Sequence, residues 1–179
     1  MIDFTFDWFT PTIPRLEPIF LKDAKRILEI GCFEGRSTLW FLEQAPKACV
    51  TCVDSFKGGS DLIGIDLTGL KERFLSNIAG HRLRVHLYIG DSWDVCRELD
   101  SNFYDFVYVD GSHEECDVIH DALQAFRVVR PGGIVVFDDY GWGTEGQSRP
   151  KEAIDYFLRC FGPKTEVLVM NYIVAIKKC

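Results

Sequence analysis

Short apolar runs alternate along the chain with stretches in which apolar residues recur every three or four positions. Continuous apolar runs are typical of parallel strands buried on both faces, whereas the wider spacing is typical of helices with one buried side. The runs predict five strands, over residues 26–31, 48–54, 84–90, 104–110 and 133–139. The wider spacing predicts helices over residues 37–44, 70–79, 93–99 and 115–129.

The last part of the chain has a different pattern. Residues 165–170 and 172–178 are β-rich runs separated only by Asn171, which predicts a closing antiparallel hairpin. Helices are expected over residues 151–160, before this hairpin, and over residues 14–22, before the first strand. Because strands and helices alternate, we expect a Rossmann-like, doubly wound α/β fold with a mostly parallel seven-stranded sheet. A length of 179 residues predicts one domain spanning residues 1–179.

Composition narrows the classes of function. A formal charge of −7 argues against a nucleic-acid-binding surface, and no apolar run reaches the roughly 20 residues of a membrane span. The first residues, MIDFTFDWFTPTIP, lack the basic start of a secretory signal, so we expect a cytoplasmic protein. Seven scattered cysteines indicate reduced thiols, and Cys49 and Cys52 lie in a predicted strand where they point to opposite faces.

Glycines follow the first predicted strand, in ILEIGCFEGRST, and a predicted helix follows them. This arrangement places backbone N–H groups and a helix N-terminus beside any bound ligand. Gly31 and Gly35 have the spacing GxxxG, whereas a pyrophosphate-binding loop has GxGxxG. Glu29 and Ser37 flank the turn and could accept and donate hydrogen bonds. Ordinary turn chemistry also explains this pattern.

Polar residues also follow the next two predicted strands. Asp54 ends the second strand, where a carboxylate can accept hydrogen bonds from ribose hydroxyls. Asp91, Ser92 and Trp93 follow the third strand and offer polar groups and an aromatic plane that suit an adenine ring. Asp54 could instead cap the strand end, and Asp91 could be only the N-cap of its helix.

Three carboxylates follow strands four and five. Asp110, Asp138 and Asp139 should lie near one another, because adjacent parallel strands end side by side. Such a group repels itself unless a cation lies between its members, and oxygen ligands suit Mg²⁺, Mn²⁺ or Ca²⁺. Turn or helix capping is the alternative for these acids. His113 is close to Asp110 in sequence and could be a base, a metal ligand or a loop residue.

Aromatic residues flank the same region. Tyr140 and Trp142 stand at the start of a glycine-punctuated loop, residues 141–147, that could cover an acceptor. Trp8 and Phe9 could line the same pocket, although core packing would explain all four side chains. The remaining histidines are expected to be structural: His81, His86 and His120.

The segments LEIGCFEGRS, VDSF, GDS, YDFVYVDGSH and RPGGIVVFDDYGW occur in this order over nearly the whole chain. Together they resemble the class I S-adenosylmethionine-dependent methyltransferases, and within these the catechol, caffeoyl-CoA and macrocin-type O-methyltransferases. The resemblance implies cofactor contacts from Glu29, Gly31, Gly35, Ser37, Asp54, Asp91 and Ser92, to which we add Trp93 and Asp110. It also implies a divalent cation, most simply Mg²⁺, at Asp110, Asp138 and Asp139. The relatives commonly have Asn where this chain has Asp139, which adds charge to the site.

Methyl transfer from a sulfonium to a hydroxyl requires that the hydroxyl lose its proton. We therefore expect His113 and Asp110 to be catalytic in O-methylation of a small hydroxylated acceptor, in a pocket that a second copy of the chain could complete. Metal-independent N- or C-methylation and a non-catalytic cofactor-binding module are the alternatives. An NAD-dependent oxidoreductase is disfavoured because GxGxxG is missing, and an adenine methyltransferase is disfavoured because VDGSH replaces its Asn-Pro-Pro-Tyr segment.

Overall fold

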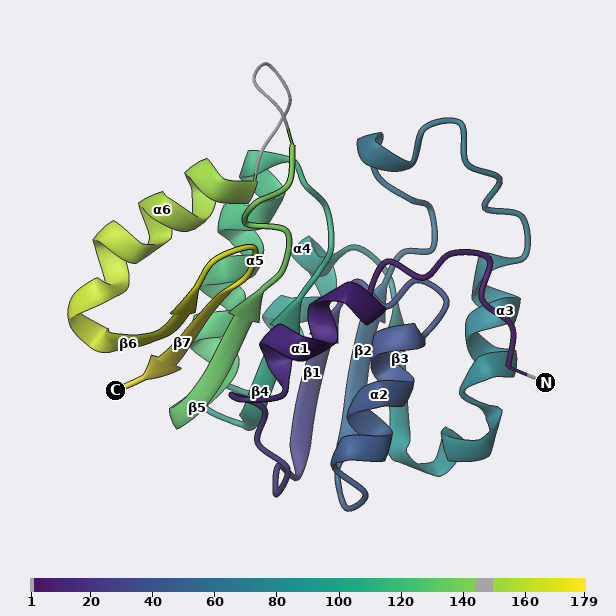
Figure 1. Cartoon of the computed structure of the whole chain (residues 1–179), viewed down its shortest axis with the longest axis horizontal. Helices are drawn as coiled ribbons and strands as arrows, with labels where there is room; N and C mark the ends of the chain where they lie inside the picture. The colour runs from purple at the N-terminus through teal and green to yellow at the C-terminus, as the bar shows by residue number, and fades with distance from the viewer. Residues whose placement is uncertain (1, 144–149) are drawn as a thin grey trace.

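Seven strands form one twisted sheet in the computed structural model, which describes residues 2–143 and 150–179. Their order across the sheet is β3-β2-β1-β4-β5-β7-β6 (Figure 1). The first five strands pair in parallel, and β7 lies antiparallel between β5 and β6. The strands are β1 (Arg26–Ile30), β2 (Cys49–Asp54), β3 (Val85–Ile89), β4 (Tyr104–Val109), β5 (Val129–Phe137), β6 (Thr165–Met170) and β7 (Val174–Lys178). The predicted mostly parallel sheet and closing hairpin are confirmed.

The order of the strands places the ends of β1 and β4 at the centre of the sheet. The chain moves outward from β1 to β2 and β3, then crosses back to β4 on the other side of β1. Ligands of open α/β sheets bind at such a reversal, outside the carboxyl ends of the strands. Asp110 comes directly after β4, and Asp138 and Asp139 come directly after β5, so all three acids lie at that edge.

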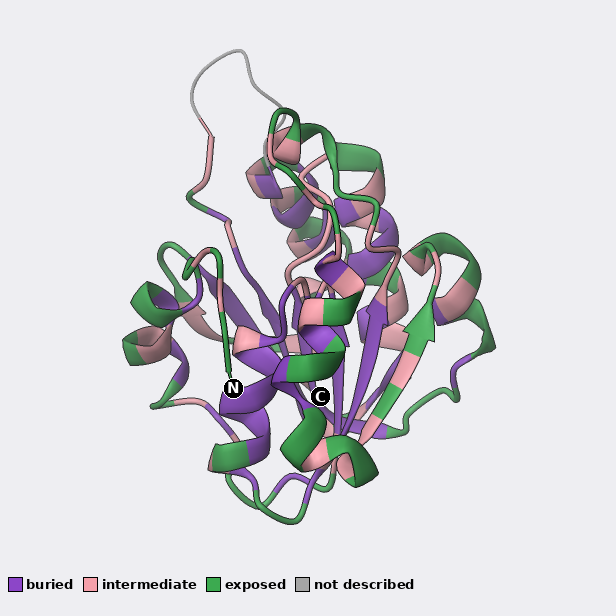
Figure 2. Cartoon of the chain, turned by 90° about the vertical axis from the view of Figure 1, so that its right-hand side faces the viewer, coloured by how far each residue is buried: buried purple, intermediate pink, exposed green. Residues whose placement is uncertain are grey.

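Helices cover both faces of the sheet and create two apolar cores. The helices are α1 (Ile13–Leu16), α2 (Arg36–Gln44), α3 (Leu70–Asn77), α4 (Ser92–Val95), α5 (Glu115–Val128) and α6 (Pro150–Phe161). Residues of α1, α2 and α3 share one core with one face of the strands, and residues of α5 and α6 share the other. All six residues of β4 are buried, whereas the edge strand β3 is largely exposed (Figure 2).

Three predicted helices are shorter than expected. The helix predicted over residues 14–22 ends early: a 3-10 turn over Thr10–Thr12 leads into α1, which ends at Leu16. Proline explains the early end, because Pro18 has no N–H for a helical hydrogen bond. The helix predicted over residues 93–99 is one turn of α4 followed by a 3-10 turn over Cys96–Glu98. Similarly, α3 gives way to a 3-10 segment over Ala79–Arg84.

The segment before α1 runs across the carboxyl ends of the strands toward α3 (Figure 1). Its backbone reaches α3, where the amide of Asp3 donates to Asn77 Oδ1 at 2.8 Å. Phe9 is buried in the core shared with α2, whereas Trp8 is exposed. Within the described residues, no helix combines the length and the apolar character that crossing a bilayer requires.

Candidate functional site

A cavity of about 850 Å³ opens at the carboxyl ends of the parallel strands. This volume is within the range of small-molecule sites. Its walls come from the loop after β1, the ends of β2 and β4, the loops after β3 and β5, the segment before α1, and the turn between β6 and β7. Nine of the predicted site residues line it: Gly31, Ser37, Asp54, Asp91, Ser92, Asp110, His113, Asp138 and Asp139.

Two glycines shape the loop between β1 and α2. Gly31 has a φ of +81°, and a Cβ at this position would lie 2.0 Å from the carbonyl oxygen of Asp110. Gly35 has a φ of +82° and is the N-cap of α2. Between them Phe33 also has a left-handed backbone, with a φ of 45°, which is uncommon for a bulky residue. The loop therefore passes close to the end of β4 in a conformation that only glycine allows at Gly31.

Asp54 holds this loop in place. Its Oδ2 accepts hydrogen bonds from the amides of Cys32 and Phe33 at 2.8 and 2.9 Å, and its Oδ1 accepts one from Phe56 at 2.7 Å. A carboxylate has about four acceptor positions, so these bonds leave little capacity for ribose hydroxyls. Asp54 lines the cavity as predicted, and in addition it positions the loop of the first strand.

Glu29 does not lie where the sequence placed it. Its carboxylate is fully buried, does not line the cavity, and accepts hydrogen bonds from the hydroxyls of Ser37 and Thr38. Burial raises the pKa of Glu29 to about 7, although those hydrogen bonds oppose the shift. In this structure Glu29 anchors the first turn of α2 to β1 from behind the cavity, which corrects the expected direct contact with a ligand.

Replacing Glu29 by glutamine is expected to change how stability depends on pH. Because the pKa of Glu29 is about 7 in the folded chain and near 4.5 ordinarily, its contribution is fully present below pH 4.5 and is lost as the pH rises through 7. The shift corresponds to about 3 kcal/mol. Urea denaturation at a series of pH values tests this. Relative to wild type, the free energy of unfolding of Glu29→Gln should rise by about that much between pH 4.5 and pH 8.

The exposed Glu43→Gln variant on the same helix is the matched control and should follow the wild-type curve. Parallel pH curves for wild type and Glu29→Gln would show that the raised pKa is wrong.

The N-terminus of α2 offers free hydrogen-bond donors to the cavity. No described side chain caps this end of the helix, since Gly35 occupies the N-cap position. The amides of Cys32 and Phe33 are already bonded to Asp54, so donors for an anionic group come instead from the first turn of α2. Ser37, in that turn, lines the cavity.

The loop after β3 brings two of its three predicted residues to the cavity. Asp91 and Ser92 line the cavity, but Trp93 does not. The indole of Trp93 stacks on His120 with 3.9 Å between ring centroids and donates to Asp117 Oδ1 at 2.9 Å. The structure thus places Trp93 against α5. Asp121, which was not predicted, lines the cavity beside Ser92, and its carboxylate is buried.

The carboxylates after β4 and β5 meet as predicted, but they are not equivalent. Burial, with Asp138 and Asp139 nearby, raises the pKa of Asp110 well above its ordinary value. Burial also raises the pKa of Asp138 to about 6, although the Tyr108 hydroxyl donates to it. Asp139 has the opposite shift: despite its burial, hydrogen bonds from His113 and Tyr172 lower its pKa. The carboxylates of Asp110, Asp138 and Asp139 repel one another, and a bound cation would relieve this repulsion.

The atoms that could share one metal ion belong to Asp110, His113 and Asp139, whose ligand atoms lie within 4.8 Å of one another. This differs from the expected group, in which Asp138 was the third ligand. The reason is local: Asp138 Oδ1 accepts the amide of Asp139 at 2.8 Å, and its other oxygen accepts the Tyr108 hydroxyl. Asp139 has a left-handed backbone with a φ of 56°, which turns its side chain toward His113.

His113 is held on both sides by acids. Its Nε2 lies 3.1 Å from Asp139 Oδ2, and its Nδ1 lies 3.6 Å from Asp61 Oδ2. Burial alone would lower the pKa of His113, but Asp139 and Asp61 outweigh it and raise the pKa. A raised pKa makes His113 a stronger base and increases its protonated fraction at neutral pH. Trp142 packs on its ring, with centroids 4.4 Å apart.

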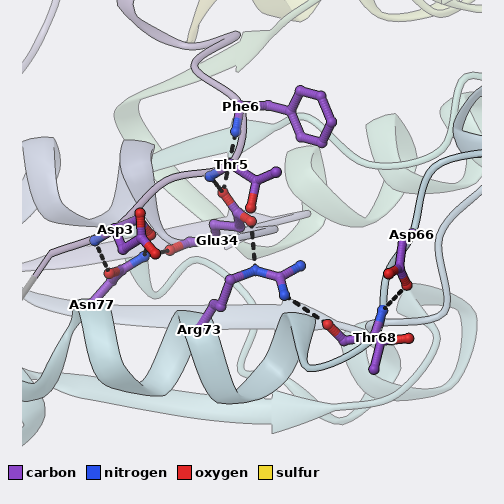
Figure 3. A network of polar contacts seen from close by, with 8 residues as sticks. All are labelled: Asp3, Thr5, Phe6, Glu34, Asp66, Thr68, Arg73 and Asn77. Carbon is purple, nitrogen blue, oxygen red and sulfur yellow. Dashed lines mark hydrogen bonds and ion pairs between the residues drawn. The ribbon is translucent and has the colours of Figure 1, made fainter.

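Glu34, between the two glycines, organises the walls of the cavity (Figure 3). Its carboxylate is buried and accepts the amide of Thr5 at 2.7 Å and the Nε of Arg73 at 2.7 Å. Arg73 also donates to the carbonyl of Thr68 at 2.6 Å, and Asn77 donates to the carbonyl of Glu34 at 2.9 Å. One side chain therefore joins the first loop, the segment before α1 and the loop before α3.

The sequence did not single out several residues of this cavity. Trp8, Phe9 and Trp142 line it as expected, whereas Tyr140 bonds to Asp155 and Lys151 outside it. Residues 144–147 of the predicted covering loop lie outside the described residues. Phe33 and Glu34 lie inside the glycine turn, where the charge of Glu34 was a usable signal. The others are brought in from distant segments: Arg15, Asp61, Asp121 and Tyr172.

The chain is similar to several known proteins. An uncharacterized protein of Acanthamoeba polyphaga mimivirus is 30% identical over 146 residues, covering 76% of this chain and 61% of that protein. A catechol O-methyltransferase of Mycobacterium tuberculosis is 26% identical, with 73% and 56% covered. The O-methyltransferase TomG from Streptomyces achromogenes, solved in complex with S-adenosylmethionine, has a TM-score of 0.67 at 19% identity, with 88% and 74% covered.

The extent of these matches differs between this chain and its relatives. The chain spans between 43% and 61% of the length of the curated relatives that it matches. A family model for a methyltransferase domain matches residues 28–140, from β1 to the end of the acidic loop. This match includes both the glycine turn and the carboxylates of the cavity, and the chain therefore belongs to the methyltransferase domain family.

Proposed function

We propose that this chain is an S-adenosylmethionine-dependent methyltransferase that methylates a hydroxyl group of a small acceptor with the help of a divalent cation. The observation that carries the proposal is the cavity itself, which has the glycine turn and the open N-terminus of α2 on one side and Asp110, His113 and Asp139 on another. A donor and an acceptor bound there would share one enclosed space.

The residues present fit the cofactor. The first turn of α2 offers N–H donors to a carboxylate, and Asp91 and Ser92 offer polar groups beside β3 to a nucleoside. When bound, S-adenosylmethionine would supply an electrophilic methyl group on a sulfonium. Gly31 keeps the loop against the end of β4, so that Asp110 faces the same space.

The residues also fit a cation with oxygen ligands, such as Mg²⁺. Asp110 and Asp139 provide carboxylate oxygens, and His113 provides a nitrogen within the same group. When bound, a divalent cation would lower the pKa of an acceptor hydroxyl. His113, oriented by Asp139 and Asp61, is the group proposed to take the hydroxyl proton, which leaves Asp110 and Asp139 as the oxygen ligands.

Titration calorimetry with S-adenosylmethionine, alone, with Mg²⁺ and with EDTA, tests the proposal. We expect saturable cofactor binding in all three conditions. We also expect Asp139→Asn to weaken Mg²⁺ binding by about tenfold or more, because a ligand charge is lost, while cofactor affinity stays unchanged. Asp94→Asn, which removes an exposed carboxylate outside the cavity, should leave both affinities unchanged.

The outcomes distinguish the alternatives. A chain that does not bind the cofactor is not a methyltransferase of this kind. Cofactor binding without any affinity for Mg²⁺ would favour metal-independent methylation of nitrogen or carbon. Binding of both without transfer to any hydroxylated acceptor would favour a non-catalytic cofactor-binding module.

A further inference from the structure

We propose that the acceptor carries an oxyanion, a carboxylate or a phosphate, and that Arg15 binds it. This inference rests on the proposed function, because it concerns the acceptor side of the same cavity. Arg15 lies on α1 and lines the cavity. It was not predicted, since nothing in the sequence near it indicates a ligand.

Two contacts fix the guanidinium of Arg15. Its Nη1 donates to the carbonyl of Pro11 at 2.6 Å, and its central carbon lies 5.3 Å from the centroid of the Tyr172 ring. The hydroxyl of Tyr172 donates to Asp139 Oδ1 at 2.9 Å. The side chain of Tyr172 therefore contacts both Arg15 and Asp139, and Asp139 belongs to the group proposed to bind the cation and the acceptor hydroxyl.

The position of Tyr172 is itself constrained. The amide of Gly141 donates to the carbonyl of Tyr172 at 3.2 Å, and a Cβ on Gly141 would lie 2.8 Å from the Tyr172 ring. The loop after β5 thus packs directly on this tyrosine. A preformed support of this kind lowers the entropy lost when Arg15 binds a ligand.

Arg15 differs from the other cationic side chains of the cavity by its contact with Tyr172, the side chain that bonds to Asp139. Three lysine or arginine side chains line it among the described residues: Arg15, Arg36 and Lys57. Arg36 lies 3.7 Å from Asp7, and Lys57 is on the loop that follows β2. Within 4.0 Å, no carboxylate of the described residues faces Arg15 or Lys57, and of these two only Arg15 is on the side of the cavity where Tyr172 and Asp139 lie.

An arginine without a carboxylate partner has chemical consequences in such a cavity. One N–H group bonds to Pro11, and the others are available as a planar fork that matches a carboxylate or a phosphate. The chain is acidic and the floor of the cavity is acidic, so Arg15 is the place on the acceptor side where an anionic substituent is attracted.

Calorimetry on the chain loaded with S-adenosylhomocysteine and Mg²⁺ tests this inference. The probes are 3,4-dihydroxybenzoate, 3,4-dihydroxyphenylphosphonate and the neutral 3,4-dihydroxybenzamide, which share the hydroxyl pair and differ in the charge of the other end. We expect at least one anionic probe to bind about tenfold or more tightly than the amide, as charge-assisted hydrogen bonds imply. The stronger anionic probe identifies carboxylate or phosphate as the natural group.

Variants of Arg15 complete the test. Arg15→Gln should abolish the preference for the anion, and Arg15→Lys should keep part of it, because the charge remains but the fork is lost. Arg159→Gln is the matched control, since Arg159 also lies over a tyrosine ring, 5.6 Å from Tyr156, but does not line the cavity. Thermal unfolding of each variant checks that α1 still packs.

Each outcome has a distinct meaning. Equal binding of the amide and both anions, an anion preference that survives in Arg15→Gln, or no probe binding by the loaded chain would overturn the role of Arg15. Failure to bind S-adenosylhomocysteine at all would instead overturn the proposed function.

Discussion

Gly31→Ala is expected to lower the free energy of unfolding by more than about 3 kcal/mol. The new Cβ would lie 2.0 Å from the carbonyl oxygen of Asp110, so the loop after β1 and the end of β4 would have to separate. The backbone at Gly31, with a φ of +81°, adds strain of its own. Urea denaturation measures the loss, and a chain of this length should lose roughly 6–12 °C in Tm.

Two other glycines distinguish the effect of the steric clash with Asp110 from the effect of the positive φ at Gly31. Gly64 has a φ of +90° with no atom within 4 Å of its Cβ position, so Gly64→Ala should cost only about 1 kcal/mol. Gly80 has neither a positive φ nor a close neighbour, so Gly80→Ala should be neutral or slightly stabilising. If Gly31→Ala were no more costly than Gly64→Ala, the close approach of the two loops would not exist.

Glu34→Ala is expected to cost about 3 kcal/mol, because it leaves Arg73 without its ion-pair partner and the amide of Thr5 without an acceptor. The loss of unfolding free energy in Glu34→Ala should be smaller at acidic pH. Although burial opposes it, hydrogen bonds from Thr5 and Arg73 lower the pKa of Glu34, so its contribution is present above its ordinary pKa and is lost as the pH falls.

Hydrogen exchange distinguishes a specific role of Glu34 from general destabilisation. The amides of Thr5 and Phe6 should exchange much faster in Glu34→Ala than in wild type, while amides of β4 should change only in proportion to global stability. Glu43→Gln, an exposed substitution on α2, should change neither. Unchanged exchange at Thr5 in Glu34→Ala would show that Glu34 does not hold the segment before α1.

The sheet could be predicted because its strands carry their own signal. All residues of β4 are apolar apart from Asp105, and in the structure this strand is buried on both faces between β1 and β5. The helix before β1 could not be predicted in the same way. Its apolar spacing continues past Leu16, but Pro18 ends the helix, and packing of Phe20 on α2 satisfies the apolar residues instead.

The parts of the candidate site that directly follow a strand could be predicted from the sequence. The glycine turn, Asp54 and the acids after β4 and β5 each follow a strand, so the topology fixes their place. Residues that join the site from elsewhere gave no such signal: Asp61 approaches His113, and Tyr172 bonds to Asp139. The direction of a side chain also cannot be derived from its position, which is why Glu29 and Trp93 proved to face away from the cavity.

The cavity is closed by segments far apart in the chain, since Thr5 and Phe6 bond to Glu34 while Tyr172 bonds to Asp139. Either contact can open without separating the strands of the sheet, so we expect the segments that close the cavity to open at a lower free energy than the sheet itself. A ligand bound in the cavity would therefore protect these closing segments from local opening, because it binds only the closed form.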